Sequence, residues 1–137
     1  MIRDIIIGEH IFNDYAKDAN PLDLFILEDL IDTLKANLNR CVGMAANMIG
    51  YNKKIIVFVD DNNKIGYMIN PKIIKKEIEY ETEESCLSLK ESHKAVRYKS
   101  IKVEFYNDKF QKRLKNFNGF VAQIIQHEID HLNKIII

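Results

Sequence analysis

The residues near the end of the chain carry the strongest chemical signal. His127, Glu128 and His131 form the pattern His-Glu-x-x-His. On a helix, two histidines four residues apart lie on one face, so both imidazoles can bind the same metal ion. The glutamate beside the first histidine can then reach a water on that ion and act as a general base. The alternative is a chance histidine pair on an amphipathic helix. We favour the metal site because the pattern falls on a predicted helix, beside its apolar stripe.

A catalytic metal site usually has three protein ligands and one open position. Cys86 is a candidate for the third ligand, because it lies between two β segments and a thiolate binds divalent ions strongly. Taken alone, Cys86 is better interpreted as a small buried apolar residue, the commonest fate of a free cysteine. The other histidines, His10 and His93, are expected at the surface. The third ligand therefore stays open at this point.

Two helices and a β-rich middle are predicted to position these residues. The first helix should cover about residues 21–39, because Asn20 can cap it and Pro21 suits its first position. The last helix should cover about 119–133, and its apolar stripe consists of Val121, Ile124, Ile125, Ile129 and Leu132. Residues 41–50 fit neither a helix nor a strand cleanly. Strands are expected at 55–59, 65–69, 73–81, 101–106 and 110–117.

Composition narrows the class of protein. The 137 residues are enough for one domain, residues 1–137, with a core of its own. The counts of basic and acidic side chains are 20 and 20, and this zero net charge argues against a dedicated nucleic-acid binder. No apolar run reaches the ~20 residues that span a membrane, and two cysteines make no disulfide framework. We therefore expect a cytoplasmic protein that binds neither nucleic acid nor membrane.

Three short segments resemble, in order, the motifs of the peptide deformylase family. Residues 41–48 read Cys-Val-Gly-Met-Ala-Ala-Asn-Met, where the family has Gly-x-Gly-apolar-Ala-Ala-x-Gln. Residues 84–88 read Glu-Ser-Cys-Leu-Ser, where the family has Glu-Gly-Cys-Leu-Ser. Residues 126–132 read Gln-His-Glu-Ile-Asp-His-Leu and match Gln-His-Glu-x-Asp-His-Leu. The resemblance spans about residues 41–134, and the order and spacing of the motifs make it specific.

The resemblance implies a fold, a metal and a reaction. The fold would be α+β, with antiparallel β-sheets around the C-terminal His-Glu-x-x-His helix and an N-terminal helix. Cys86, His127 and His131 would hold one divalent ion, with Fe(II) expected in the cell and Zn(II) or Ni(II) as substitutes. The reaction would remove the N-formyl group from the initiator methionine of nascent chains and release formate. Transient proximity to the ribosome would follow from such a substrate.

The resemblance also implies roles for individual residues. Glu128 would be the general base, and the backbone N–H of Leu87 would stabilise the oxyanion formed from the formyl oxygen. The backbone at Gly43 would pair with the extended substrate as an added strand does. Met44 would contact the methionine side chain of the substrate. Arg97 falls near a basic residue that often follows the second motif, and would also lie at the substrate.

The departures from the family pattern fall in the site itself. Met48 stands in the substrate site where the family has a glutamine, and a thioether donates no hydrogen bond. The loss of one oxyanion donor typically costs ~2.7–4 kcal/mol in the transition state. Cys41 and Ser85 replace glycines. Three functions therefore remain open: a deformylase with a compensating donor, a paralogue that acts on another formyl or acyl amide, and a non-enzymatic protein that keeps the metal for stability.

Overall fold

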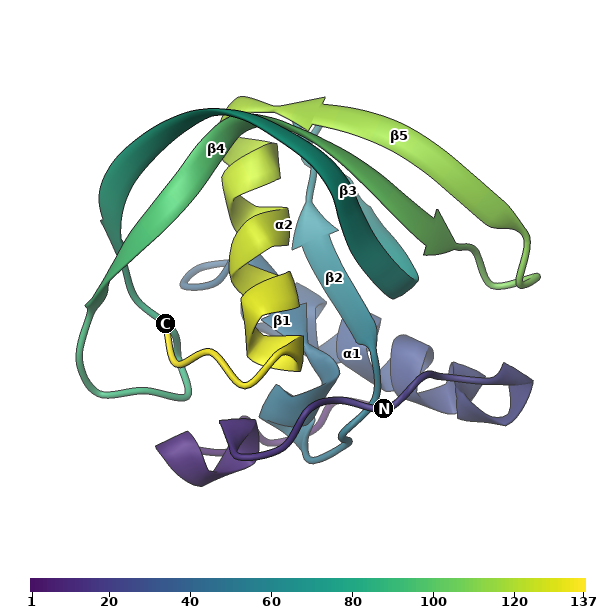
Figure 1. The fold of residues 1–137 in the computed structure, drawn as a ribbon. Helices are drawn as coiled ribbons and strands as arrows, with labels where there is room; N and C mark the ends of the chain where they lie inside the picture. Colours follow the sequence, from purple (N-terminus) through teal and green to yellow (C-terminus); the bar gives the residue numbers. More distant parts are fainter.

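In the computed structural model, which describes all 137 residues, one antiparallel sheet wraps around a C-terminal helix (Figure 1). Helix α1 (Leu24–Ala36) lies in the first third of the chain and helix α2 (Gly119–Leu132) near its end. The expected α+β class and both helices are confirmed, and the predicted sheets form a single continuous sheet. Its strands pair in chain order: β1 (Gly43–Ala45), β2 (Ile55–Val59), β3 (Ile65–Glu84), β4 (His93–Tyr106) and β5 (Lys112–Asn118).

Helix α2 lies in the concave side of the sheet, and strands β3, β4 and β5 arch over its N-terminal end (Figure 1). Its polar residues Gln126, His127, Glu128 and His131 are buried as well. A helix that is enclosed on several sides has little freedom to move. A metal site needs such rigidity, because its ligands must be held in fixed positions. The predicted apolar stripe packs into one core cluster, which includes Ile56, Val103, Val121, Ile124, Ile125, Ile129 and Leu132.

Helix α1 begins after a 3-10 turn, Pro21–Asp23. The Asn20 side chain accepts a hydrogen bond from the Leu22 N–H, and the Asp23 carboxylate accepts one from the Asn20 N–H, so the predicted cap is present. The helix ends at Ala36, earlier than the predicted end at about 39. A second core cluster lies beneath it, and its members include Leu30, Leu34, Met44, Met48 and Cys86.

Strand β3 runs without a break through the segment that was expected to form two strands, 65–69 and 73–81. The Asn-Pro step between them is a bulge and not a turn. Asn70 has φ 51°, and its side-chain amide bonds to both the N–H and the C=O of Ala19. Bulges bend a strand and increase its twist. Two register shifts in the pairing with β4 accompany the arch of β3 over α2. Strand β3 ends at Glu84, the first residue of the second motif.

Residues 41–50 fold as strand β1 followed by the 3-10 turn Ala46–Ile49. Every residue of these two elements is buried. A segment that is buried on both faces shows no alternation of polar and apolar side chains, which explains why no periodic pattern identifies it. Since β1 is the first strand of the sheet, its second edge has no strand partner.

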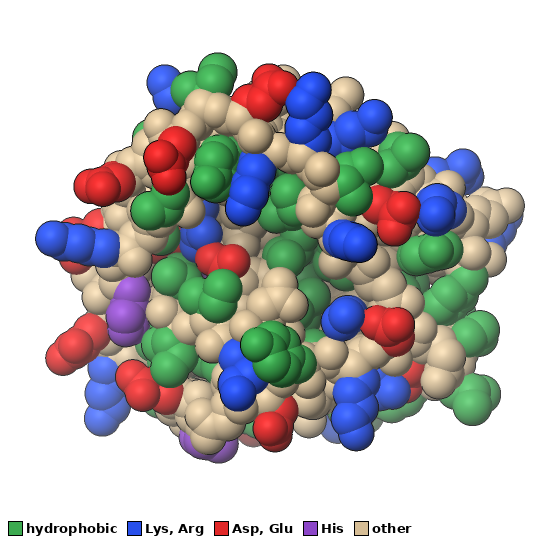
Figure 2. All heavy atoms as spheres, in the orientation of Figure 1, with side chains coloured by type: hydrophobic (Ala, Val, Ile, Leu, Met, Phe, Trp, Pro, Cys, Tyr) green, Lys and Arg blue, Asp and Glu red, His purple; other side chains and the backbone are tan.

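The surface mixes charged and apolar side chains. On the face drawn in Figure 2, apolar side chains gather near the middle, and cationic and anionic side chains are interspersed around them. No helix of the protein is both long enough and apolar enough to cross a membrane.

Candidate active site

Helix α2 presents two imidazoles to one point. His127 and His131 are buried, and their Nε2 atoms lie 3.0 Å apart with the rings nearly perpendicular. Two nitrogens that bind one tetrahedral Zn(II) at about 2.0–2.1 Å would lie roughly 3.3 Å apart. The observed spacing is close to that value, so the two rings are placed to share an ion. Phe12 stacks on the His131 ring at a centroid distance of 4.2 Å and holds its plane.

Cys86 joins this pair from a different element. It lies in the loop after β3, in a turn that is closed by a hydrogen bond from the Leu89 N–H to the Cys86 carbonyl. Its Sγ and one ring nitrogen of each histidine lie within 4.8 Å of one another, and all three residues are buried. The structure thus brings together the three side chains predicted as ligands, whereas His10 and His93 lie outside this group.

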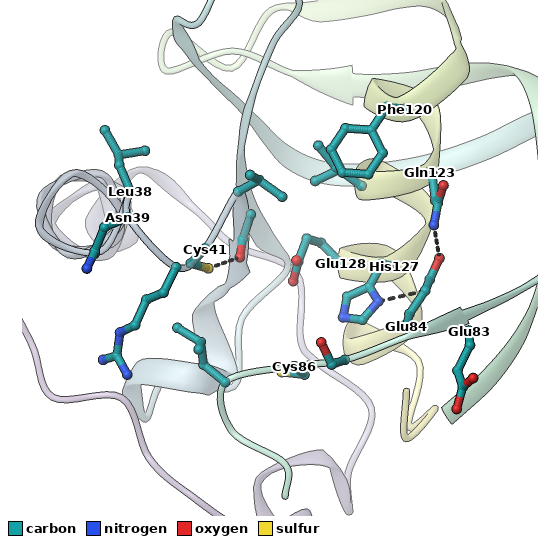
Figure 3. Close-up of a pocket in the computed structure, with 16 residues that line it drawn as sticks. Leu38, Asn39, Cys41, Glu83, Glu84, Cys86, Phe120, Gln123, His127 and Glu128 are labelled. Atoms are coloured by element: carbon teal, nitrogen blue, oxygen red, sulfur yellow. Dashed lines mark hydrogen bonds and ion pairs between the residues drawn. The ribbon is translucent and has the colours of Figure 1, made fainter. Parts of the chain in front are cut away.

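Glu84 supports the ring of His127 from behind (Figure 3). Its Oε1 lies 2.7 Å from His127 Nδ1, and Arg97 donates to both of its oxygens at 2.7–3.1 Å. Burial raises the pKa of Glu84, but the hydrogen bonds from His127 and Arg97 outweigh this effect and hold the pKa at about 2. A carboxylate accepts only, so Nδ1 must carry the proton and Nε2 is left free for a metal.

Arg97 belongs to this support and does not reach the cavity. Its side chain is buried, and its other arm donates to Asp130 Oδ2 at 2.6 Å. It is not among the residues that line the cavity in front of the histidines. The expectation that Arg97 contacts substrate is therefore corrected: two carboxylates occupy its guanidinium, and it acts on the site through Glu84.

Glu128 is a buried carboxyl group with an open lone pair. It is 4% exposed, and its Oε1 has no hydrogen-bond partner. Burial raises the pKa of Glu128 to about 7, although the charge of His127 opposes this. A carboxyl group with a pKa near neutrality can both accept and donate a proton at physiological pH.

A cavity of about 460 Å³ opens in front of these groups, between α2, β1 and the loop after β3 (Figure 3). Five predicted site residues line it: Gly43, Cys86, Leu87, His127 and Glu128. Its walls also include apolar side chains from three segments, namely Leu38, Val42, Phe120 and Ile124. The cavity therefore combines a polar floor with an apolar wall, as sites for small ligands commonly do.

Met44 and Met48 do not line this cavity. Both are buried in the core cluster beneath α1, and successive side chains of a strand point to opposite faces. Gly43 therefore faces α2 while Met44 faces the core beneath α1, and the expected contact of Met44 with substrate is corrected. Met48 lies in the 3-10 turn that follows β1 and belongs to the same core cluster as Cys86, so its place at the substrate stays a prediction. Asn47 does not replace the missing donor, because its Nδ2 donates to the His131 carbonyl at 2.9 Å.

Strand β1 approaches α2 so closely that only glycine fits at position 43. A Cβ on Gly43 would lie 2.6 Å from Ile124 Cγ2 and 2.9 Å from Glu128 Oε2. Both distances are too short for unbonded atoms. The glycine of the first motif is thus required by the packing of the backbone against the helix that carries the candidate base.

The free edge of β1 carries one side-chain hydrogen bond. The Val42 carbonyl accepts from the Val59 N–H, so the next carbonyl along the strand, that of Gly43, points away from β2. Cys41 Sγ donates to this Gly43 oxygen at 2.9 Å. Burial raises the pKa of the Cys41 thiol to about 12, so the thiol keeps its proton and remains a donor.

Several cavity residues were not predicted from the sequence. Gln123 lies one turn before His127 on α2, so helical spacing was an available signal for it. Leu38 and Phe120 had no such signal, because only the packing of distant segments brings them to the cavity. Glu84 was recognised as part of a motif, but its bond to His127 depends on the course of β3.

The electrostatics of the site fit a bound cation. Burial lowers the pKa of His127, but hydrogen bonds with Cys86 and Glu84 raise it overall, to about 10. Burial and the charge of His127 lower the pKa of His131 well below its ordinary value. Without an ion, one proton on His127 thus supplies positive charge where the three ligands converge. A divalent ion on the same ligands would take over that function.

Comparisons with known proteins agree with this geometry. The sequence model of the family described as Polypeptide deformylase matches residues 6–137. The peptide deformylase of Clostridium beijerinckii is 51% identical over 137 residues, which is 100% of both chains. Peptide deformylase 2 of Clostridium acetobutylicum is 38% identical over 112 residues, covering 81% of this chain and 73% of that protein. The crystal structure of the Thermotoga maritima peptide deformylase has a TM-score of 0.86 at 29% identity and covers 99% of this chain and 95% of that one.

Proposed function

The chain belongs to the polypeptide deformylase family, and from this premise we propose that it hydrolyses the formyl amide of N-formylmethionyl peptides. The C–N bond of the amide would break, water would be added, and formate and a free amine would be released. The unpartnered Oε1 of buried Glu128, in the cavity that Cys86 and His127 also line, carries this proposal. We place the reaction in the cytoplasm, with transient proximity to the ribosome, because nascent chains carry this formyl group.

Three side chains would hold one divalent ion: Cys86, His127 and His131. We propose Fe(II) in the cell, with Zn(II) and Ni(II) as substitutes. When bound, such an ion supplies Lewis acidity, which polarises a carbonyl and lowers the pKa of water. The remainder of the chain keeps the ligands in place: Glu84 holds the ring of His127, and Phe12 holds that of His131.

Glu128 would carry the proton through the reaction. Its free Oε1 would accept a proton from the attacking water and then deliver that proton to the leaving nitrogen. A pKa of about 7 suits both steps, because neither protonation state is strongly disfavoured at neutral pH. Glu128 is well buried, so bulk water would not compete for this proton.

The backbone N–H of Leu87 would stabilise the developing oxyanion. This N–H donates no hydrogen bond within the protein, and Leu87 lines the cavity beside Cys86. A free backbone donor next to a metal ligand is well placed to bind a charged oxygen. Met48 supplies no second donor, so we expect the chemical step to be slower than in a protein with a glutamine there.

The substrate backbone would lie along the free edge of β1. An extended peptide can add to such an edge and pair with its carbonyl and N–H groups, here at Gly43. The methionine side chain of the substrate would then contact the apolar wall that includes Val42, Phe120 and Ile124.

One observation favours a second candidate reaction. Met48 has no hydrogen-bond donor and the Asn47 amide donates to the His131 carbonyl, so no side chain of this turn is free to donate to the oxygen of a formyl group. A paralogue that cleaves another formyl or acyl amide would tolerate this difference if its substrate supplied other contacts. A site that held metal for stability alone would have no use for the unpartnered carboxyl group of Glu128.

An assay of formate release would test the proposal directly. Protein purified without oxygen and loaded with Fe(II) should release one formate per free amine from an N-formyl-Met peptide, and Glu128→Ala should abolish this release. Release of acid only from other formyl or acyl amides would favour the second reaction. No release from any of these amides, with the metal bound, would reject both.

A further inference from the structure

Gln123 is a polar residue in the cavity wall that the proposed reaction does not use. It lies on α2 one turn before His127. A glutamine at the edge of a cavity would ordinarily leave its amide to solvent. This amide is bonded at both ends. Nε2 donates to Glu84 Oε2 at 2.8 Å (Figure 3), and Oε1 accepts from the Tyr80 hydroxyl at 3.2 Å. Gln123 therefore links Tyr80 to Glu84, the carboxylate that supports the proposed metal ligand His127.

The chemistry of the partners fixes which way the amide points. A carboxylate accepts hydrogen bonds and cannot donate them, so the amide atom that faces Glu84 must be nitrogen. The amide oxygen of Gln123 then faces Tyr80, whose hydroxyl can donate to it. A flipped amide would place its oxygen against the carboxylate of Glu84. Tyr80 thus favours the orientation that Glu84 requires.

The Glu84 carboxylate is held from two directions. From β4, Arg97 donates to both oxygens, and Arg97 is itself bound to Asp130. From α2, His127 binds Oε1 and Gln123 binds Oε2. Because Gln123 and His127 lie one turn apart on the same helix, their two bonds set the carboxylate relative to that helix. Arg97 approaches from the sheet and cannot provide this alignment alone.

We propose that Gln123, oriented by Tyr80, is a positioning residue that aligns the Glu84 carboxylate with His127 Nδ1 and so keeps His127 Nε2 aimed at the metal. Its effect on turnover rests on the proposed function. Its effect on metal affinity does not depend on which amide the protein cleaves, so the two can fail separately.

Two variants test this chain of hydrogen bonds at different points. Gln123→Leu removes both amide bonds, whereas Tyr80→Phe removes only the outer bond and leaves the cavity intact, since Tyr80 does not line it. Zn(II) affinity is measured by competition with a chromophoric chelator at one pH. We expect a loss of about 3- to 10-fold for Gln123→Leu and about 2-fold for Tyr80→Phe. Loss of a direct partner of a metal-bound histidine typically costs about 10- to 100-fold, and Gln123 is one bond further out.

Gln126→Leu is the matched control. Gln126 is also buried on α2, but its amide bonds to the backbone N–H and C=O of Tyr98 on β4 and has no link to Glu84. This variant should be less stable, yet its folded fraction should bind Zn(II) with unchanged affinity. The double variant Tyr80→Phe/Gln123→Leu should bind no more weakly than Gln123→Leu alone, because Tyr80 acts only through Gln123.

A spectroscopic readout separates positioning from general packing. In the Co(II)-loaded protein, the visible absorption bands should shift in Gln123→Leu and Tyr80→Phe but not in Gln126→Leu. With N-formyl-Met peptide, Gln123→Leu should lower kcat and leave KM within about 2-fold, because the apolar wall is retained. Unchanged Zn(II) affinity and unchanged Co(II) bands in both folded variants would overturn the positioning role. If the wild type released no formate, the proposed function would fall, and the Zn(II) measurement would still decide the role of Gln123.

Discussion

One wall of the candidate site is made of charged side chains that bind one another, whereas the opposite wall is made of backbone and buried apolar side chains. We name the first the charged wall: Glu84, Cys86, His127 and Glu128, together with Arg97, which supports Glu84 from behind. We name the second the backbone wall: residues 41–49. In the charged wall, hydrogen bonds of 2.6–3.1 Å join Glu84 to His127 and to Arg97, and Arg97 to Asp130. In the backbone wall, Met44, Ala45, Ala46, Met48 and Ile49 are buried in the core.

The difference indicates where side-chain identity matters. Within the charged wall, Glu84, Arg97 and His127 bind one another, so a substitution at any of them leaves a buried polar group without a partner. In the backbone wall, Gly43 is required by close packing, and its carbonyl accepts a hydrogen bond from the Cys41 thiol. The departures from the family motifs at Cys41 and Met48 lie in this wall. Large effects are therefore expected from the charged wall and smaller effects from the backbone wall.

The largest effect should follow from removal of a ligand. His131→Ala or Cys86→Ala should lower metal affinity by more than about 1000-fold, because two remaining ligands cannot hold a divalent ion against chelators. Metal content after dialysis measures this loss. His10→Ala is the matched control, since His10 is exposed and lies outside the ligand group. One equivalent of metal retained by both ligand variants would refute the assigned centre.

Glu128→Gln should abolish turnover without loss of metal. The amide cannot accept a proton from water, and removal of a general base typically lowers the rate by about 10²- to 10⁴-fold. Turnover and metal content are measured on the same preparation. Glu83→Gln is the control, because Glu83 lies at the cavity rim and its carboxylate bonds to Ser92. Equal rates for Glu128→Gln and the wild type would mean that another group moves the proton.

Glu84→Gln should weaken Zn(II) binding by about 10- to 100-fold, the range typical for the partner of a metal-bound histidine. The amide cannot accept from His127 Nδ1 and from both Nε and Nη2 of Arg97 at once. Chelator competition at constant pH measures the change. Unaltered Zn(II) affinity would show that the hydrogen bonds of Glu84 stabilise the fold but do not strengthen metal binding.

Asp29→Asn makes the same change at an ion pair outside the site. Burial raises the pKa of Asp29, but hydrogen bonds from the Met1 amino group and from Arg3 outweigh it and hold the pKa below its ordinary value. Because the folded-state pKa is lowered, this carboxylate stabilises the protein above the ordinary aspartate pKa near 4, and the benefit disappears as the pH falls. Asp29→Asn should lower the free energy of unfolding at pH 7, should lower it less as the pH falls below the ordinary aspartate pKa, and should leave Zn(II) affinity unchanged.

Sequence patterns predicted the two walls unequally. The histidine pair and the stripe of α2 follow from helical spacing, and the cap at Asn20 follows from local chemistry. Strand β3 could not be recognised as one element, because a bulge at Asn70 gives the same signal as a turn. Strand β4 begins at His93, well before the predicted 101, and its first half was missed because residues 93–100, His-Lys-Ala-Val-Arg-Tyr-Lys-Ser, do not alternate apolar and polar side chains. The roles of Arg97 and Met48 depend on which face of the fold each occupies, and no local pattern encodes that.

Met48→Gln should raise turnover about 10-fold if its amide reaches the formyl oxygen, because one oxyanion donor is restored. It should also lower the free energy of unfolding by about 1–3 kcal/mol, since Met48 is buried in an apolar cluster that includes Cys86. Initial rates and denaturant unfolding measure the two effects. Met44→Gln is the control: it buries the same amide in the same cluster, next to Gly43, and should destabilise without any gain in rate. A loss of stability alone at position 48 would show that the backbone wall cannot supply a side-chain donor.

Cys41→Ala should have the smallest effect and should act on KM. The Cys41 thiol now donates to the Gly43 carbonyl, the acceptor that an added substrate strand would use. Removal of the thiol frees this acceptor, and one neutral hydrogen bond is worth about 1 kcal/mol, so KM for an N-formyl-Met peptide should fall by about 5-fold with kcat little changed. Cys41→Ser keeps a donor at the same place and should not lower KM. An unchanged KM in Cys41→Ala would mean that the carbonyl accepts from thiol and substrate together, since an oxygen has two lone pairs. The backbone wall would then be insensitive to this side chain, and its role in substrate binding would rest on the main chain alone.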